Sequence, residues 1–223
     1  MNENLLQYLQ PTEVLDFHHP AVASFIQSRI DGAAAPAQQA VNLYYAVRDE
    51  IRYDPYTIDL SVEGLRASTT LQNGRGWCVP KAALLAALCR AMGIPAKLGY
   101  ADVKNHLSTA RMREHMKTDI FLWHGYTSIY LGGKWVKATP AFNVGLCERF
   151  QLKPLEFDGS IDSIYHPFDL LGNKHMEYLR ERGEFVDVPI DQINRDFTQT
   201  YMTSERLSAF DFQKDIEREK PQK

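Results

Sequence analysis

The sequence predicts an α+β fold in which a central helix, with a cysteine at its N-terminus, packs on an antiparallel sheet. Three observations predict it. A run of strong helix formers from Ala82 to Met92 follows Cys78 closely. Two β-rich segments are joined by Gly132-Gly133, which is typical of a tight hairpin. A chain of 223 residues can bury one substantial core.

The helices come first in this prediction. Apolar positions at helical spacing predict a helix from Ala37 to Ile51. The central helix begins after a glycine-containing turn, has Pro80 in its first turn and closes at Gly93, shortly before Pro95. Four of its residues recur at spacings of three and four and form one buried face: Leu85, Leu88, Cys89 and Met92.

The sheet follows the central helix. Residues 96–100 predict a short strand, and the polar stretch 102–119 contains a candidate helix from Thr109 to Met116. With a two-residue loop in the hairpin, paired residues are Leu131 with Lys134, Tyr130 with Trp135, Tyr126 with Thr139, and His124 with Ala141. Trp123, on the strand face opposite His124, is expected to pack inward unless the strand is bulged.

The organisation expected is a single catalytic domain over residues 1–223. Its core spans about residues 33–145, and residues 146–223 read as an irregular C-terminal extension. The 25 basic and 28 acidic residues give no field that would attract nucleic acid or an anionic membrane. No apolar run approaches the roughly 20 residues that span a bilayer. We therefore expect a cytoplasmic protein with reduced thiols; the oligomeric state is not predicted.

Cys78 is the candidate nucleophile because it stands directly before a helix. Backbone N–H groups and the positive end of the helix dipole would stabilise a thiolate there. The same N–H groups could hold an oxyanion, with the indole N–H of Trp77 as a second donor. The alternative is a small buried residue. That alternative is our expectation for Cys89, on the buried helix face, and for Cys147, which has no flanking base.

His124 is the candidate acid and base, since histidine can accept a thiol proton and return it to a leaving amine near neutral pH. The hairpin register makes Thr139 its diagonal neighbour on the same face, where a hydroxyl could fix the imidazole tautomer. A hydroxyl carries no charge and stabilises an imidazolium less than a carboxylate does. Asn143 would be the orienting amide if the strand continued past Pro140.

These segments resemble the transglutaminase-like superfamily, whose core is papain-like. The family pattern is a glycine-containing turn, a cysteine opening a helix, a GIPA stretch, and a histidine and an aspartate on a hairpin. The chain reads GRGWCVPKAALLAALCRAMGIPAKLGY and WHGYTSIYLGGKWVKATP, and the resemblance covers roughly residues 37–143. By position it makes Cys78 the nucleophile and His124 the base, while Thr139 stands where the family has its aspartate.

The resemblance implies thiol-dependent acyl transfer on amide bonds of a protein or peptide substrate. The enzyme would be a cysteine peptidase or amidase if water resolves the thioester, and a transglutaminase-like acyltransferase if an amine does. Hydrolysis is slightly favoured, because water is the default nucleophile. The alternative is a non-catalytic peptide-binding or scaffold module with a degenerate triad, and Thr139 motivates it.

Metal and cofactor sites are not predicted. One stretch gathers residue types that bind metals, but at spacings that match no closed zinc pattern: Asp158, Asp162, His166, Asp169 and His175. His18 and His19 precede Pro20 in an expected turn. No phosphate loop, dinucleotide fingerprint or zinc-finger spacing is present. We expect no cofactor.

Overall fold

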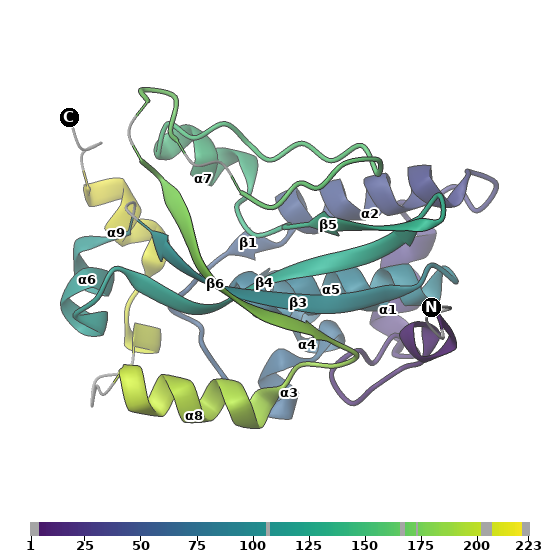
Figure 1. The fold of residues 1–223 in the computed structure, drawn as a ribbon, viewed down its shortest axis with the longest axis horizontal. Coiled ribbons are helices and arrows are strands. Elements are labelled where there is room, and N and C mark those ends of the chain that lie inside the picture. Colours follow the sequence, from purple (N-terminus) through teal and green to yellow (C-terminus); the bar gives the residue numbers. More distant parts are fainter. Residues whose placement is uncertain (1–4, 106–107, 166–167, 173, 202–206, 220–223) are drawn as a thin grey trace.

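The computed structural model describes residues 5–105, 108–165, 168–172, 174–201 and 207–219. Its centre is a four-stranded antiparallel sheet with the order β5-β4-β3-β6. Helices α2 and α5 lie behind this sheet in Figure 1. The strands are β3 (Ala96–Asn105), β4 (Ile120–Leu131), β5 (Lys134–Ala138) and β6 (Met176–Phe185). The predicted α+β class, with a central helix on an antiparallel sheet, is confirmed.

Helix α5 (Cys78–Ala91) is the predicted central helix. Every residue from Cys78 to Arg90 is buried, because the sheet covers one side of the helix and α2 (Pro36–Glu50) and α4 (Ala67–Asn73) cover the other. Trp77 caps it in an extended conformation, and Gly93 follows its end with φ of 71°. A fully buried helix in mid-domain fixes the position of its first residue.

A short parallel pair of strands delivers the chain to Cys78. Strands β1 (Arg52–Tyr53) and β2 (Arg75–Gly76) pair directly after α2 and directly before α5. Three helices complete the N-terminal half: η1 (Leu5–Leu9), α1 (Pro20–Gln27) and α3 (Val62–Leu65). The predicted helix near residues 109–116 is α6 (Ala110–Met116), and the Thr109 hydroxyl accepts the Met112 N–H at its start.

The hairpin has the predicted register at its turn, with Leu131 opposite Lys134. Pairing stops at Ala138, however, so the expected pairs of Thr139 and Ala141 do not form. The Thr139 N–H donates to the Ser163 carbonyl at 2.8 Å instead, and Ala138 forms a parallel bridge with the same residue. The chain therefore turns away from β4 at the position where the candidate third catalytic residue was expected.

The C-terminal extension is more regular than the sequence suggested. It contributes α7 (Val144–Arg149), β6, α8 (Ile190–Thr200), η2 (Leu207–Ala209) and α9 (Phe212–Arg218). The sequence does not predict strand β6, because it is an edge strand in which half of the residues are charged and the apolar residues do not alternate. It pairs with β3 and so completes the sheet of the core. None of the helices in the described ranges is long and apolar enough to cross a membrane.

Candidate active site

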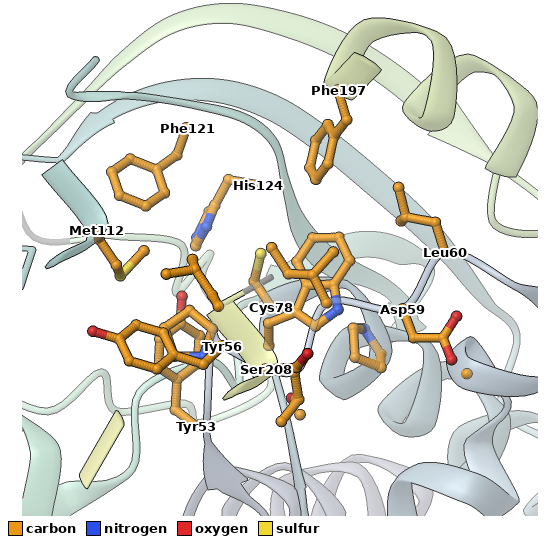
Figure 2. Close-up of a pocket in the computed structure, with 18 of the residues that line it drawn as sticks. Tyr53, Tyr56, Asp59, Leu60, Cys78, Met112, Phe121, His124, Phe197 and Ser208 are labelled. Carbon is orange, nitrogen blue, oxygen red and sulfur yellow. The ribbon is translucent and has the colours of Figure 1, made fainter. Parts of the chain in front are cut away.

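Cys78 and His124 meet at one cleft. The cleft has a volume of about 890 Å³, and both residues line it. Figure 2 shows the two side chains projecting into the same space, Cys78 from the start of α5 and His124 from β4. Both are almost fully buried, with exposed fractions of 6% and 5%. The structure therefore brings together two residues that are 46 positions apart in the chain.

Gly125 allows this meeting. A Cβ atom at Gly125 would lie 3.2 Å from the Val79 Cα and 3.3 Å from the Cys78 carbonyl oxygen, which is tighter than ordinary side-chain contacts. Only a glycine lets β4 come so close to the first turn of α5. Within the described residues, His124 makes no side-chain hydrogen bond, to Cys78 or to any other group. Catalytic hydrogen bonds often tighten only in the complex with substrate.

The electrostatics of Cys78 differ from the expectation of a stabilised thiolate. Burial raises the pKa of the Cys78 thiol to about 11 and outweighs the lowering effect of the Gly125, Val79 and Cys78 backbone N–H groups. Burial also lowers the pKa of His124 to about 4, with a smaller contribution from His175. Both shifts favour the neutral thiol and the neutral imidazole over an ion pair.

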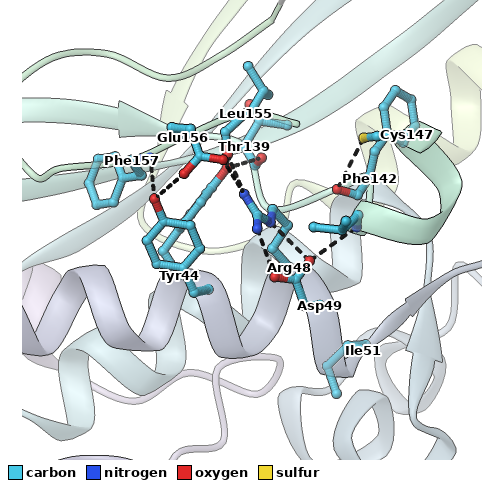
Figure 3. Close-up of polar contacts among 12 residues, drawn as sticks. Tyr44, Arg48, Asp49, Ile51, Thr139, Phe142, Cys147, Leu155, Glu156 and Phe157 are labelled. Atoms are coloured by element: carbon cyan, nitrogen blue, oxygen red, sulfur yellow. Dashed lines mark hydrogen bonds and ion pairs between the residues drawn. The ribbon is translucent and has the colours of Figure 1, made fainter. Parts of the chain in front are cut away.

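Hydrogen bonds to its backbone hold Thr139 in place. The Tyr44 hydroxyl donates to the Thr139 carbonyl at 3.3 Å and to the Leu155 carbonyl at 2.9 Å, and Arg48 also donates to Leu155, at 2.7 Å (Figure 3). In contrast, the buried Thr139 hydroxyl has no hydrogen-bond partner among the described residues. It lines a small cavity of about 20 Å³ with His124, a space large enough for one water molecule.

His175 lies at the same small cavity and was not predicted there. It is 4% exposed, lines the cavity with His124 and Thr139, and its ring centre lies 6.0 Å from that of Phe142. The sequence offered no local signal for this position, because His175 is reached only by folding the C-terminal extension back onto the sheet.

The candidate metal ligands between residues 158 and 175 do not form a cluster in the described part of the chain. Asp158 accepts the Ser160 N–H within its own turn, and Asp162 accepts the Lys137 N–H at 2.8 Å. His166 lies outside the described residues. In the part of the chain that the structure describes, no group of three or more His, Cys, Asp or Glu side chains could hold a metal ion.

Asn143 and Trp77 take different positions relative to the site. Because β5 ends at Ala138, the continuous strand that would have aligned Asn143 with His124 is absent from the described hairpin. The Asn143 Oδ1 atom accepts the Tyr53 backbone N–H at 3.2 Å instead, which ties β1 to the start of α7. Trp77 lines the cleft beside Cys78, and its ring packs 5.9 Å from that of Phe197.

The cleft has two kinds of wall (Figure 2). Near His124 the wall is aromatic and apolar, with Met112 and Phe121. On the far side of Cys78 it is more polar and includes Asp59. The C-terminal extension contributes lining residues from β6, from α8 and its end, and from η2 and just after it: Met176, Asn194, Phe197, Thr198, Tyr201, Leu207, Ser208 and Phe210.

The other two cysteines stay apart from the cleft. Cys89 is fully buried in α5, and burial raises its pKa to about 12. Cys147 is buried in α7 with its sulfur 3.9 Å from the Phe142 carbonyl oxygen. All three cysteines are free thiols, and Cys78 alone of them lines the described cleft.

The chain was compared with curated proteins and with solved structures. The comparison with curated proteins gave no significant match. Among solved structures, a candidate cysteine protease from Cytophaga hutchinsonii is similar over 83% of this chain and 55% of its own, with 17% identity and a TM-score of 0.45. A candidate protease from Parabacteroides distasonis is similar over 62% of this chain and 27% of its own, with 15% identity and a TM-score of 0.39. The chain thus spans about half or less of these proteins.

The family is shown by sequence. The model of the transglutaminase-like superfamily matches residues 24–140, which include α2, the cysteine that opens α5 and the whole hairpin up to Thr139. This membership supports a thiol-dependent enzyme function in general terms. Because the match covers more than half of the chain, the protein belongs to the transglutaminase-like superfamily.

Proposed function

We propose that the protein is a thiol-dependent acyl-transfer enzyme that acts on amide bonds of a protein or peptide substrate. Cys78 is the nucleophile and His124 is the general base and acid. The observation that carries the proposal is that Cys78 and His124, from separate elements, line one cleft. The backbone N–H groups of Gly125, Val79 and Cys78 lower the pKa of the thiol and so favour negative charge at this place.

The pKa values of the two residues favour general-base catalysis over a preformed ion pair. The thiol keeps its proton at neutral pH, because burial raises its pKa to about 11. In the proposed reaction, His124 takes that proton as the sulfur attacks the carbonyl carbon, and a carbon–sulfur bond forms. The resulting imidazolium then gives the proton to the leaving nitrogen as the carbon–nitrogen bond breaks, and a thioester remains.

The backbone N–H groups near Cys78 stabilise the oxyanion in the proposed reaction. The N–H groups of Gly125, Val79 and Cys78 lower the pKa of the Cys78 thiol. The attacked carbonyl oxygen must lie within a few ångströms of the same sulfur. A negative charge that develops there is stabilised most by donors already fixed in place. The Trp77 indole, at the same cleft, is proposed as a further donor.

A second nucleophile resolves the thioester. Water gives hydrolysis, the activity of a cysteine peptidase or amidase, and a primary amine gives a new amide, as in transglutamination. We favour hydrolysis, since water is always present.

The test is direct detection of the acyl-enzyme. Full-length protein is mixed with a library of peptides that carry glutamine and backbone amides, quenched in acid and analysed by mass spectrometry. We expect an acyl adduct on the Cys78 peptide, with release of product in water and of an amide when a small primary amine is added. Cys89→Ser is the matched control and keeps the adduct. Absence of both adduct and turnover over the whole library would reject the proposal.

A second candidate function is a non-catalytic peptide-binding module. Thr139 favours it, because its uncharged hydroxyl stands at the aspartate position and has no hydrogen-bond partner within the described residues. The neutral states of Cys78 and His124 favour it too. This candidate predicts that Cys78→Ala binds peptides from the same library as tightly as the unmodified protein, and that neither protein turns them over. Turnover that Cys78→Ala abolishes would exclude it.

A further inference from the structure

A charged network from three elements surrounds Trp123, the residue directly before His124. Asp102 on β3 accepts the Trp123 backbone N–H at 3.2 Å, and Asp196 on α8 accepts the indole N–H at 2.9 Å. Arg182 on β6 bridges both carboxylates, at 2.8 Å from Asp102 and 2.5 Å from Asp196. Its guanidinium carbon lies 4.8 Å from the centre of the Trp123 ring.

Trp123 belongs to a bulge in β4. Ala101 pairs with His124 and Val103 pairs with Phe121, so two residues of β4 face a single residue of β3. Such a bulge changes the side of the strand on which the next side chains lie. Here both His124 and Phe121 line the cleft, although regular alternation over three positions would put them on opposite faces.

The bulge needs support because its conformation is unfavourable. Trp123 has φ of 58°, a left-handed conformation that a bulky residue adopts only when its surroundings enforce it. Strained residues of this kind concentrate at functional sites. Trp123 is 2% exposed, and its ring packs against Tyr100 and Phe185. The side chain therefore points inward although the strand is bulged, whereas the sequence predicted an inward side chain for an unbulged strand.

The network acts on Trp123 from behind the cleft. Asp102 is 6% exposed, so its bonds to Trp123 and Arg182 lie in a medium of low polarity, where they are strong. The described lining of the cleft includes His124 but none of Asp102, Arg182 and Asp196. These residues therefore cannot touch a substrate in the cleft, and their effect on the chemistry must pass through Trp123.

Tyr201, at the end of α8, also forms hydrogen bonds to the backbone of β4. The Tyr201 hydroxyl accepts the Leu122 N–H at 2.7 Å and donates to the Ile120 carbonyl at 2.9 Å. The backbone of β4 before His124 is thus bonded to side chains rather than to a neighbouring strand at these points. Tyr201, like Arg182 and Asp196 but unlike Asp102, belongs to the C-terminal extension.

We propose that Asp102, Arg182 and Asp196 form a positioning network that sets the direction of His124 by holding the bulge at Trp123. The consequence for catalysis rests on the proposed function of His124 as general base. Arg182 and Asp196 lie beyond residue 140, where the family match ends. The extension is therefore part of the catalytic apparatus of this chain and not an appendage to it.

The test compares Asp102→Asn with a matched control in the full-length protein. Asn keeps the shape of Asp102 and removes the charge that Arg182 binds. Glu184→Gln is the control: it breaks the ion pair of Glu184 with Lys97, which joins the same strands β3 and β6 at 3.0 Å without touching Trp123. The first readout is the nitrogen chemical shifts of the His124 imidazole by NMR, which report tautomer and hydrogen bonding. The second is the division of the effect between kcat and KM.

In Asp102→Asn we expect changed His124 shifts and a kcat lowered about 10- to 100-fold, since small misplacements of a catalytic group have effects of this size. KM should change little, because the network lies outside the cleft lining. Glu184→Gln should leave both readouts unchanged. Unchanged His124 shifts in folded Asp102→Asn, or equal changes in Glu184→Gln, would overturn the inference.

Asp196→Asn keeps the test decisive if Asp102→Asn does not fold. Its side chain is 26% exposed, so the substitution costs less stability, and it still weakens the contacts to Trp123 and Arg182. A smaller change of the same His124 shifts is expected, and no change in this folded variant would overturn the inference. The NMR readout needs no turnover, so it also separates the two proposals: shifted His124 signals in a protein without activity would reject the proposed function alone.

Discussion

Thr139→Asp introduces a carboxylate at the position where the resemblance to the family places an aspartate. The new carboxylate would lie at the cavity of about 20 Å³ that Thr139 shares with His124 and His175. The imidazole of His124 at this cavity is neutral at pH 7, because burial lowers its pKa to about 4. The change therefore adds the one interaction that favours an imidazolium in a site that otherwise disfavours it.

The expected size follows from general pKa behaviour. An opposite charge within about 4 to 6 Å shifts a pKa by about 1 to 3 units, so the pKa of His124 should rise by that amount. A general base works when it is neutral, and the acidic limb of kcat/KM should therefore move to higher pH by about 1 to 3 units. Each unit also stabilises the imidazolium of the transition state by about 1.4 kcal/mol, so the plateau above that limb should rise.

The assay is the pH dependence of kcat/KM, with the pKa of His124 measured by NMR in the same variant. Thr139→Asn is the control, because it brings similar bulk and polarity without charge and should leave the acidic limb in place. If the limb and the His124 pKa stay the same in Thr139→Asp, the carboxylate does not act on His124. In that case, the account of Thr139 as the third position is wrong.

Three further predictions concern the support of the site. Gly125→Ala should lower kcat and destabilise the fold by about 1 to 3 kcal/mol, because the added Cβ would lie 3.2 Å from the Val79 Cα. Enzyme kinetics and urea unfolding measure the two effects, and an unchanged kcat would contradict the prediction. Lys81→Met should lower the free energy of unfolding by about 2 to 4 kcal/mol, since the buried Lys81 amino group donates to two carbonyl oxygens at the end of α2. No change in urea titration would show that these carbonyls need no donor. His124 should make the free energy of unfolding depend on pH, because its pKa is about 4 in the folded protein and about 6.5 in the unfolded chain. Between these two values the unfolded chain binds more protons than the folded protein. The free energy of unfolding should therefore fall by up to about 3 kcal/mol as the pH falls through this range. His124→Gln should remove this loss, and an unchanged pH dependence of unfolding would refute the assignment.

The parts of the site that the sequence predicted are set by local signals. Cys78 could be placed because a turn, a proline in the first helical turn and a closing glycine mark both ends of α5 within a short stretch. The Gly132-Gly133 turn placed His124 on the first strand of a hairpin, although the expected pair with Ala141 does not form and His124 lies opposite Ala101. In both cases the residues that determine the structure are near neighbours in the chain.

The parts that were missed depend on contacts between distant segments. The hairpin was extended too far because the competing partner of Thr139 is Ser163, whose backbone replaces β4 at that point. For His175 the sequence suggests only a residue type that binds metals, since nothing near it in the chain points to His124. Strand β6 has the charged pattern of an edge strand, which single-sequence reasoning takes for an irregular segment.

The protonation of the site and the choice of the second nucleophile have one physical cause, which is the access of water. Burial is the largest contribution to the pKa shifts of both Cys78 and His124. Part of the wall that shields them comes from the C-terminal extension, through Phe197, Tyr201 and Leu207. A wetter cleft would lower the thiol pKa, raise the imidazole pKa and supply water to the thioester. Changes in this wall should therefore alter thiol reactivity and the ratio of hydrolysis to amine transfer together, whereas the network at Trp123 should alter the rate of both reactions equally.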